Sequence, residues 1–314
     1  MKLSCAVEEY VSAKRSMGMR FRTQADTLRA FSQAMGPVSI RDVSPPLALA
    51  FLATSGRVTT SWHQRFWTIR GLYRFAIPRG YAASCPLPDI LPKRPPYATP
   101  YIYSVGELQR LLSAATILGG RNGGLGRAAF RTLILLLYGS GLRINEALTL
   151  NVNDVDLAEG LLVINKTKFD KSRLVPIGPK LIAALRHHVE QGPGQPRRLL
   201  PSKFFVTVNG LSLDPQIADR DFRIVRGAAR IHREDGAFFQ PRLHDLRHTF
   251  AVHRLTSWYR SGADVQRLLP KLSTYLGHVG IAETAHYLTM TPELLNEASR
   301  RFEHYAFPEV SHHV

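Results

Sequence analysis

The chain has 314 residues, of which 45% are hydrophobic and 21% charged, a composition typical of a globular protein with room for two domains. Its 41 Lys and Arg outnumber its 24 Asp and Glu, and the formal net charge of +17 favours a polyanionic partner, either nucleic acid or an anionic membrane. The longest apolar run, 133–138, is far short of the ~20 residues that cross a bilayer, so a membrane-spanning protein is excluded. Two cysteines build neither a disulfide framework nor a thiolate metal site, so a disulfide-rich protein is excluded as well. A cytoplasmic, nucleoid-associated protein is expected.

Residues 1–85 are predicted to form a small all-α domain. Apolar residues recur at helical spacing, and helices are expected at 7–17, 23–35, 47–52 and 59–77. The last of these carries an apolar stripe that favours a buried core over a base-stacking platform. The cations of this region are therefore the better DNA contacts, and the candidates are Lys14, Arg15, Arg20, Arg22, Arg65, Arg70 and Arg74.

A proline-rich segment, 86–100, follows this helical domain. Prolines at this density exclude a helix, because each lacks a backbone N–H and fixes its φ angle. The segment is predicted to be a semi-rigid linker between two domains.

Residues 101–314 are predicted to form a mixed α/β domain. A capping box from Ser104 to Glu107 begins its first helix. Strands are expected at 161–165 and 173–177, joined by the basic turn 166–171, and a further strand is indicated at 204–208. Pro270 predicts a kink or a break before residue 276. Helices are expected at 108–115, 127–138, 142–150, 179–190, 219–231, 243–259 and 292–305. The predicted fold class is therefore mainly α with a small β-sheet.

One set of side chains has the composition that phosphoryl transfer without a metal requires. The guanidinium forks of Arg143 and Arg247 can hold the two non-bridging oxygens of a phosphodiester. The phenol of Tyr287 can attack the phosphorus, and His244 and His278 can exchange protons or donate hydrogen bonds. Such chemistry needs neither a metal nor a nucleotide cofactor.

Five sequence blocks in this domain resemble the tyrosine recombinase (phage integrase) family. They are Tyr138-Gly-Ser-Gly-Leu-Arg143 with Glu146, Thr167-Lys168, His244-Asp-Leu-Arg247-His248, Leu276-Gly-His278, and Glu283-Thr-Ala-His-Tyr287. Each block alone is weak. Their common order across most of residues 100–305 makes a chance match very improbable.

The resemblance implies a role for each residue. Arg143 and Arg247 would clamp the scissile phosphate, and Tyr287 would attack it to form a 3′-phosphotyrosine. Lys168 would protonate the leaving 5′-oxygen; Lys166 and Lys171 are alternatives for this role. His244 would accept the phenol proton and His278 would bind a phosphate oxygen, whereas Glu146 and His248 would support the site.

Each of these residues also has a structural interpretation. Arg143 and Glu146 could form a surface ion pair, and Tyr287 alone could be a core residue. His244 and His248 have the spacing of a zinc pair, but no glutamate occupies the catalytic position. The amphipathic tail after Tyr287, which contains the helix expected at 292–305, could dock on a neighbouring subunit or on its own domain.

The family also implies an assembly and a biological role. Two domains would clamp double-stranded DNA at a specific core site, with one dimer on each site and a homotetramer on two sites. Sister recombinases or accessory proteins are further partners, and strand exchange would pass through a Holliday junction. The amino-terminal segment and the Pro270 region favour a mobile-element enzyme for integration, excision or transposition. A type IB topoisomerase-like enzyme and a non-catalytic DNA-binding accessory protein are the alternatives.

Overall fold

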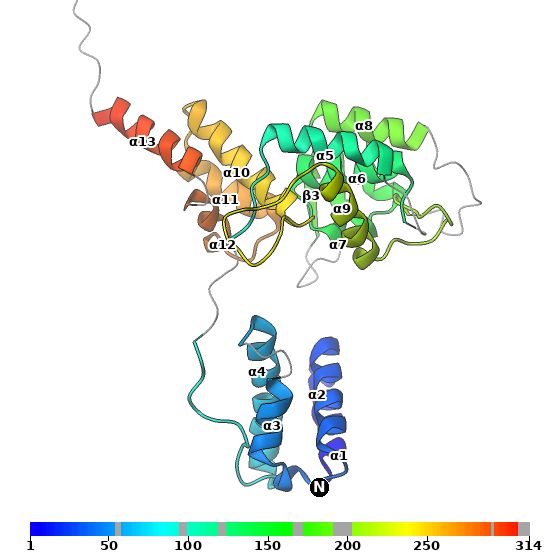
Figure 1. The fold of residues 1–314 in the computed structure, drawn as a ribbon, viewed down its shortest axis with the longest axis vertical. Helices are drawn as coiled ribbons and strands as arrows, with labels where there is room; N and C mark the ends of the chain where they lie inside the picture. Colours follow the sequence, from blue (N-terminus) through cyan, green and yellow to red (C-terminus); the bar gives the residue numbers. More distant parts are fainter. Residues whose placement is uncertain are drawn as a thin grey trace, which may run out of the picture. The chain divides into compact units, whose positions relative to one another are not determined.

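The computed structural model describes residues 1–53, 58–93, 99–118, 124–165, 172–190, 203–289 and 292–306. The chain divides into two compact units, Met1–Tyr97 and Ala98–Val314 (Figure 1). Among the described residues, no helix combines the length and the apolar character that crossing a membrane requires.

The described residues of the first unit form a bundle of four helices. They are α1 (Leu3–Ser16), α2 (Arg22–Met35), α3 (Pro45–Leu52) and α4 (Thr60–Ala76), with short 3-10 turns at Ile40–Asp42 and Ile77–Arg79. Helix α4 begins where the Thr59 side chain accepts a hydrogen bond from the backbone N–H of Trp62 at 3.0 Å. Phe66, Ile69 and Tyr73 are buried in the core. The prediction that this stripe forms core is therefore confirmed from Trp62 to Tyr73, whereas Ile77 at its end is 39% exposed.

The second unit begins with helices around a small sheet. Ser104 and Glu107 exchange the predicted capping-box hydrogen bonds at 2.8 and 3.3 Å. The helices are α5 (Val105–Leu118), α6 (Arg127–Ser140), α7 (Ile144–Thr149), α8 (Pro179–Glu190) and α9 (Pro215–Ala228), with a 3-10 turn at Val152–Asp154. The antiparallel sheet has the order β1 (Val155–Asp156), β2 (Leu161–Ile164) and β3 (Arg173–Pro176). The register pairs Ile164 with Arg173, so β3 enters the sheet at that arginine.

The carboxyl-terminal part of this unit carries most of the predicted chemistry. It contains α10 (Asp245–Arg260), α11 (Val265–Leu276), α12 (Ala282–Ala285), a 3-10 turn (His286–Thr289) and α13 (Pro292–Ala306). Helix α13 packs on its own unit, where Leu294 is buried and Glu297 accepts a hydrogen bond from Arg260 at 3.0 Å. Leu295 and Phe302 stay 49% and 66% exposed.

One local prediction is wrong, and the break that was one alternative at Pro270 is absent. Residues 204–208 form no strand: Phe204, Phe205 and Val206 are all buried in an irregular segment, and only an isolated bridge joins Lys203 to Asn151. Helix α11 continues through Pro270 without a break. Its apolar face is buried on both sides of the proline, and this packing outweighs a cost of about 3 kcal/mol for an interior proline.

Candidate active site

Three arginines meet at the carboxyl-terminal end of α11. The last carbonyls of a helix lack intrahelical partners and carry its partial negative charge. Here the consecutive carbonyls of residues 275–277 each accept a hydrogen bond from a different guanidinium group. Arg173 Nε donates at 2.9 Å, Arg247 Nη2 at 2.7 Å and Arg143 Nη2 at 3.1 Å. The helix end therefore gathers side chains from the N-cap of α7, from β3 and from α10 at one point.

Arg143 is positioned by the first turn of α7. Its backbone N–H donates to Glu146 Oε2 at 3.0 Å, and its Nη1 donates to Oε1 at 3.1 Å. With the bond to the Gly277 carbonyl, two of its five N–H groups are used, and three have no partner among the described residues. Because the side chain is 34% exposed, these groups can reach a substrate oxygen.

Glu146 is a buried carboxylate between two arginines. Arg173 binds it with both ends of its fork, at 3.0 and 2.8 Å, and the two side chains are 11% and 9% exposed. Burial alone would raise the pKa of Glu146, but the hydrogen bonds from Arg173 and Arg143 outweigh it and lower the pKa to about 2. Arg173 was predicted only as a strand residue. The Arg143–Glu146 pair belongs to a buried network, not to an isolated surface ion pair.

Arg247 bridges the carboxyl-terminal ends of α6 and α11. It is 2% exposed and donates to the carbonyls of Gly141, which caps α6, and of Leu276, both at 2.7 Å. Gly141 has a φ of 63°, and a Cβ there would lie 2.5 Å from the Phe250 ring, so only glycine fits. Burial and the nearby Arg143 charge lower the pKa of Arg247 to about 10. The site thus stores positive charge that an anion would stabilise.

Tyr287 lies beside two histidines. Its side chain is 3% exposed, and its hydroxyl lies 3.1 Å from Nδ1 of His248. The His278 ring stacks on the phenol with centroids 6.1 Å apart, and His278 Nδ1 lies 2.7 Å from the hydroxyl of the buried Thr284. His244, which was predicted to take the phenol proton, instead packs edge-on against the His248 ring at 4.9 Å. In this structure His248 is therefore the histidine whose ring nitrogen lies within hydrogen-bond distance of the phenol hydroxyl.

The histidines of the site are held neutral. Burial and neighbouring cations lower the pKa of His248 to about 3 and that of His278 to about 4. The pKa of His244 is lowered by the same two causes, although its side chain is more open to solvent. Burial raises the pKa of Tyr287, an effect that the Arg247 charge opposes. At neutral pH the site therefore combines a protonated phenol with neutral imidazoles.

These shifts predict a loss of stability in mild acid. Because the folded pKa of His248 and His278 lies below the ordinary value of 6.5, the unfolded chain takes up protons first as the pH falls. Stability should fall between pH 6.5 and pH 4, by up to about 2 kcal/mol for each partly buried imidazole at pH 5. Urea unfolding of the DNA-free protein at pH 7 and pH 5 measures this loss.

Two variants separate this effect from the general pH response. His278→Asn should flatten the pH dependence, and His187→Asn, at an exposed position of α8, should leave it as in the parent. Equal slopes for all three proteins would contradict the assigned protonation states.

The remaining predicted residues differ in what surrounds them. Lys168 lies outside the described residues. In the helical unit, Arg70 donates to Asp89 at 2.7 Å and to the Pro88 carbonyl at 3.2 Å, so it fastens the following segment to α4 and is a weaker candidate for a phosphate contact. Arg65 lies over the Phe51 ring. The others are exposed or partly exposed, namely Lys14, Arg15, Arg20, Arg22 and Arg74.

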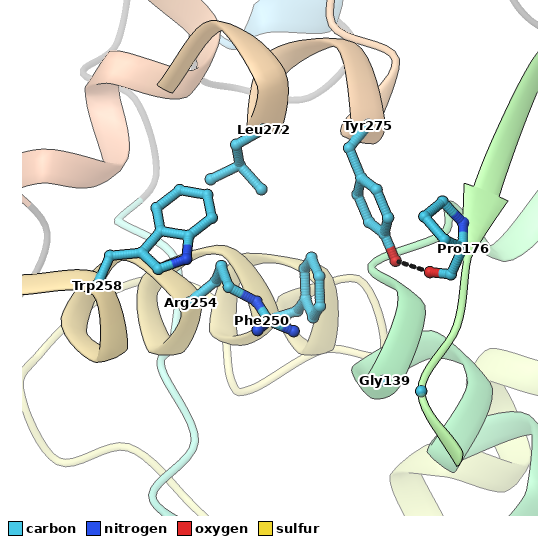
Figure 2. A pocket seen from close by; sticks show the side chains of 8 residues that line it. Gly139, Pro176, Phe250, Arg254, Trp258, Leu272 and Tyr275 are labelled. Atoms are coloured by element: carbon cyan, nitrogen blue, oxygen red, sulfur yellow. Dashed lines mark hydrogen bonds between the residues drawn. The ribbon is translucent and has the colours of Figure 1, made fainter. Parts of the chain in front are cut away.

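A separate cavity lies between α10, α11 and the end of β3 (Figure 2). Its volume is about 240 Å³, and none of the predicted catalytic residues lines it. Arg254 is its charged lining residue, and Phe250, Trp258, Leu272 and Tyr275 contribute apolar and aromatic surface. The residues predicted from the sequence to be catalytic therefore do not line this cavity.

Known proteins are similar to this chain in both sequence and fold. Residues 106–293 match the sequence profile of the phage integrase family. The chain is 37% identical over 308 residues to y4rB of Sinorhizobium fredii, named as an integrase/recombinase, covering 95% of this chain and 96% of that protein. It is 31% identical over 236 residues to tyrosine recombinase XerD of Mycobacterium leprae, covering 73% and 69% of the two chains.

A solved structure of a lambda integrase tetramer bound to a Holliday junction has a similar fold. The TM-score is 0.66 at 15% identity, with 91% of this chain and 77% of that chain covered. The predicted fold class, mainly helical with a small three-stranded sheet, is thereby confirmed.

Proposed function

The chain belongs to the phage integrase family of tyrosine recombinases, enzymes that break and rejoin DNA strands, and we propose that it does so through Tyr287. The observation that supports this assignment is the convergence of one buried phenol with a cluster of arginines. The Tyr287 hydroxyl lies against His248, and the charge of Arg247 acts on its pKa. Arg143 and Arg247 are held by adjacent carbonyls at the end of α11.

In the proposed reaction, the phenol oxygen of Tyr287 bonds to the scissile phosphorus as the bond to the 5′-oxygen breaks. The negative charge of the bound phosphate would raise the pKa of His248, which already contacts the hydroxyl and accepts the phenol proton, with His244 as the alternative acceptor. Lys168 protonates the leaving 5′-oxygen. Arg143 and Arg247 neutralise the charge that develops on the non-bridging oxygens, and His278 donates a hydrogen bond to one of them.

The covalent product determines the energetics of rejoining. A 3′-phosphotyrosine link keeps one phosphoester bond for each bond broken, so the free energy of the phosphodiester is retained. A 5′-hydroxyl can therefore attack the link, expel the phenol and reseal the strand without a nucleotide cofactor. When that hydroxyl belongs to a second duplex, the same step exchanges strands and creates a Holliday junction.

We further propose that the enzyme acts as a homotetramer on two DNA sites, for a mobile genetic element. The full-length similarity to an integrase/recombinase supports this role, and the solved lambda integrase tetramer on a Holliday junction gives a precedent for the assembly. The exposed cations of the helical unit would contact phosphates. The exposed Leu295 and Phe302 of α13 are the candidate contacts to a neighbouring subunit.

One experiment tests this function and its rivals together. The protein is incubated with sheared DNA of its host, SDS-resistant adducts are isolated, and the attached DNA is sequenced to obtain the site. Two differently labelled duplexes carrying that site should then yield recombinant strands. Relaxation of a supercoiled plasmid without strand exchange would favour the topoisomerase-like alternative. Binding without any adduct would favour the accessory protein.

A further inference from the structure

We propose that Arg173 is a positioning residue, which keeps Arg143 free to bind the scissile phosphate by neutralising Glu146. This inference rests on the proposed function of the site. Arg173 is not assigned a contact with the substrate, because both ends of its fork bind the Glu146 carboxylate and its Nε binds the Tyr275 carbonyl. Its influence on the phosphate must therefore pass through Glu146.

The position of Arg173 is fixed from several sides. Its Nε donates to the Tyr275 carbonyl at 2.9 Å, and a Cβ added to Gly277 would lie 2.7 Å from its Nη1. Gly277 also has a φ of 67°, so the sequence needs glycine there both for the backbone and for the passing guanidinium. The arginine is thus packed directly against the residue whose carbonyl binds Arg143.

Strand β3 is attached to α11 at both of its ends. Arg173 makes the attachment at the first residue of the strand. At the last, the Pro176 carbonyl accepts a hydrogen bond from the Tyr275 hydroxyl at 3.1 Å, the dashed line in Figure 2. The Tyr275 ring also stacks on Phe250 at 5.6 Å. These contacts give Arg173 a rigid base from which to hold Glu146.

Without Arg173, we expect Arg143 to bind Glu146 more fully and the phosphate less well. Glu146 is 9% exposed and stays ionised with a pKa of about 2 because two arginines bind it. A buried carboxylate that loses its bidentate partner must recruit another cation. Arg143 is already bonded to it at 3.1 Å, so its guanidinium would turn further toward Glu146. The N–H groups that should meet the phosphate would then be displaced.

The test measures single-turnover adduct formation at saturating DNA, on a nicked half-site of the sequence recovered from wild-type adducts. Arg173→Gln is expected to lower this rate by about 10²-fold, as a displacement of about 1 Å would, while DNA affinity stays within about twofold. Arg173→Lys should recover part of the rate, because it keeps the charge but not the fork.

The double variant Arg173→Gln/Glu146→Gln distinguishes positioning from general damage. Without the buried charge, Arg143 is no longer drawn away, so the double variant should react no more slowly than Arg173→Gln alone. If the two substitutions acted independently, the rate of the double variant would instead fall by the product of the losses measured for Arg173→Gln and for Glu146→Gln alone. Arg186→Gln, which removes the same charge from an exposed site on α8, should react like the parent.

The possible results separate the inference from the function beneath it. If Arg173→Gln reacts at the parental rate, or if the two losses multiply, the positioning role is wrong while the recombinase assignment stands. If the parent protein forms no adduct, the proposed function fails and the inference fails with it. Should Arg173→Gln melt below the assay temperature, adduct formation is compared at a temperature where both proteins are folded, and a rate for Arg173→Gln within about twofold of the parent there overturns the proposal.

Discussion

Replacement of Tyr287 by phenylalanine is expected to abolish covalent adduct formation while DNA binding persists. The substitution removes one buried oxygen and keeps the ring that packs against His278. Without its nucleophile the enzyme should cleave at least about 10⁴-fold more slowly. The lost contact with His248 should change the free energy of unfolding by only about 1 kcal/mol. Adducts are counted on denaturing gels, and affinity is measured by gel shift on the same half-site.

Histidine variants then identify the acceptor of the phenol proton. His248→Asn should slow adduct formation by about 10²-fold or more, and more than His244→Asn, because His248 and not His244 lies within hydrogen-bond distance of the hydroxyl. A Tyr287→Phe protein that still forms adducts would remove Tyr287 from the role of nucleophile. A larger loss at His244 than at His248 would show that the histidine pair rearranges when DNA binds.

The local elements could be predicted because their signals are local. Helices with a clear apolar period, such as α8 and α4, were expected within a residue or two of their observed bounds. Residues 204–208 misled because a run of buried aromatic and aliphatic side chains resembles a strand whether or not its backbone pairs. Pro270 misled for the opposite reason, since tertiary packing overrides a local helix breaker.

The candidate site could be named from sequence only where its residues stand inside recognisable blocks. Arg143, Arg247 and Tyr287 do so, whereas Arg173 is one of several cations near a basic turn. Its importance depends on a register, Ile164 opposite Arg173, that carries the side chain to the end of α11. In the sequence, Glu146 follows Arg143 by three residues and Arg173 begins a predicted strand. No local pattern indicates that Glu146 and Arg173 meet in the folded chain.

The choice between His244 and His248 was beyond the sequence for a similar reason. Both lie one helical turn apart at the start of α10, and which ring faces the phenol depends on where the turn His286–Thr289 packs. Periodicity fixes the spacing of two side chains on a helix but not the neighbour that each one meets.

Replacement of Arg247 by methionine is expected to destroy catalysis at little cost to the DNA-free fold. Its pKa is lowered to about 10, which means that burial and Arg143 disfavour the charged guanidinium by about 3 kcal/mol. The variant removes this penalty. It also loses hydrogen bonds to the carbonyls of Gly141 and Leu276, worth about 1.5–3 kcal/mol each. The opposing effects should leave a net destabilisation of at most about 3 kcal/mol, whereas the cleavage rate should fall by about 10³-fold or more.

The two effects can be measured separately because DNA supplies the missing counter-charge. A phosphate between Arg143 and Arg247 would offset their repulsion, so half-site DNA should raise the melting temperature of the parent by more than that of Arg247→Met. Arg247→Lys is the matched control, since it keeps a charge but cannot bridge two carbonyls that each lie 2.7 Å from a different nitrogen. A different outcome would contradict this role: the methionine protein could lose more than about 5 kcal/mol of stability and still bind DNA as the parent does. Arg247 would then serve to join α6, α10 and α11. A cation other than Arg247 would have to bind the phosphate together with Arg143.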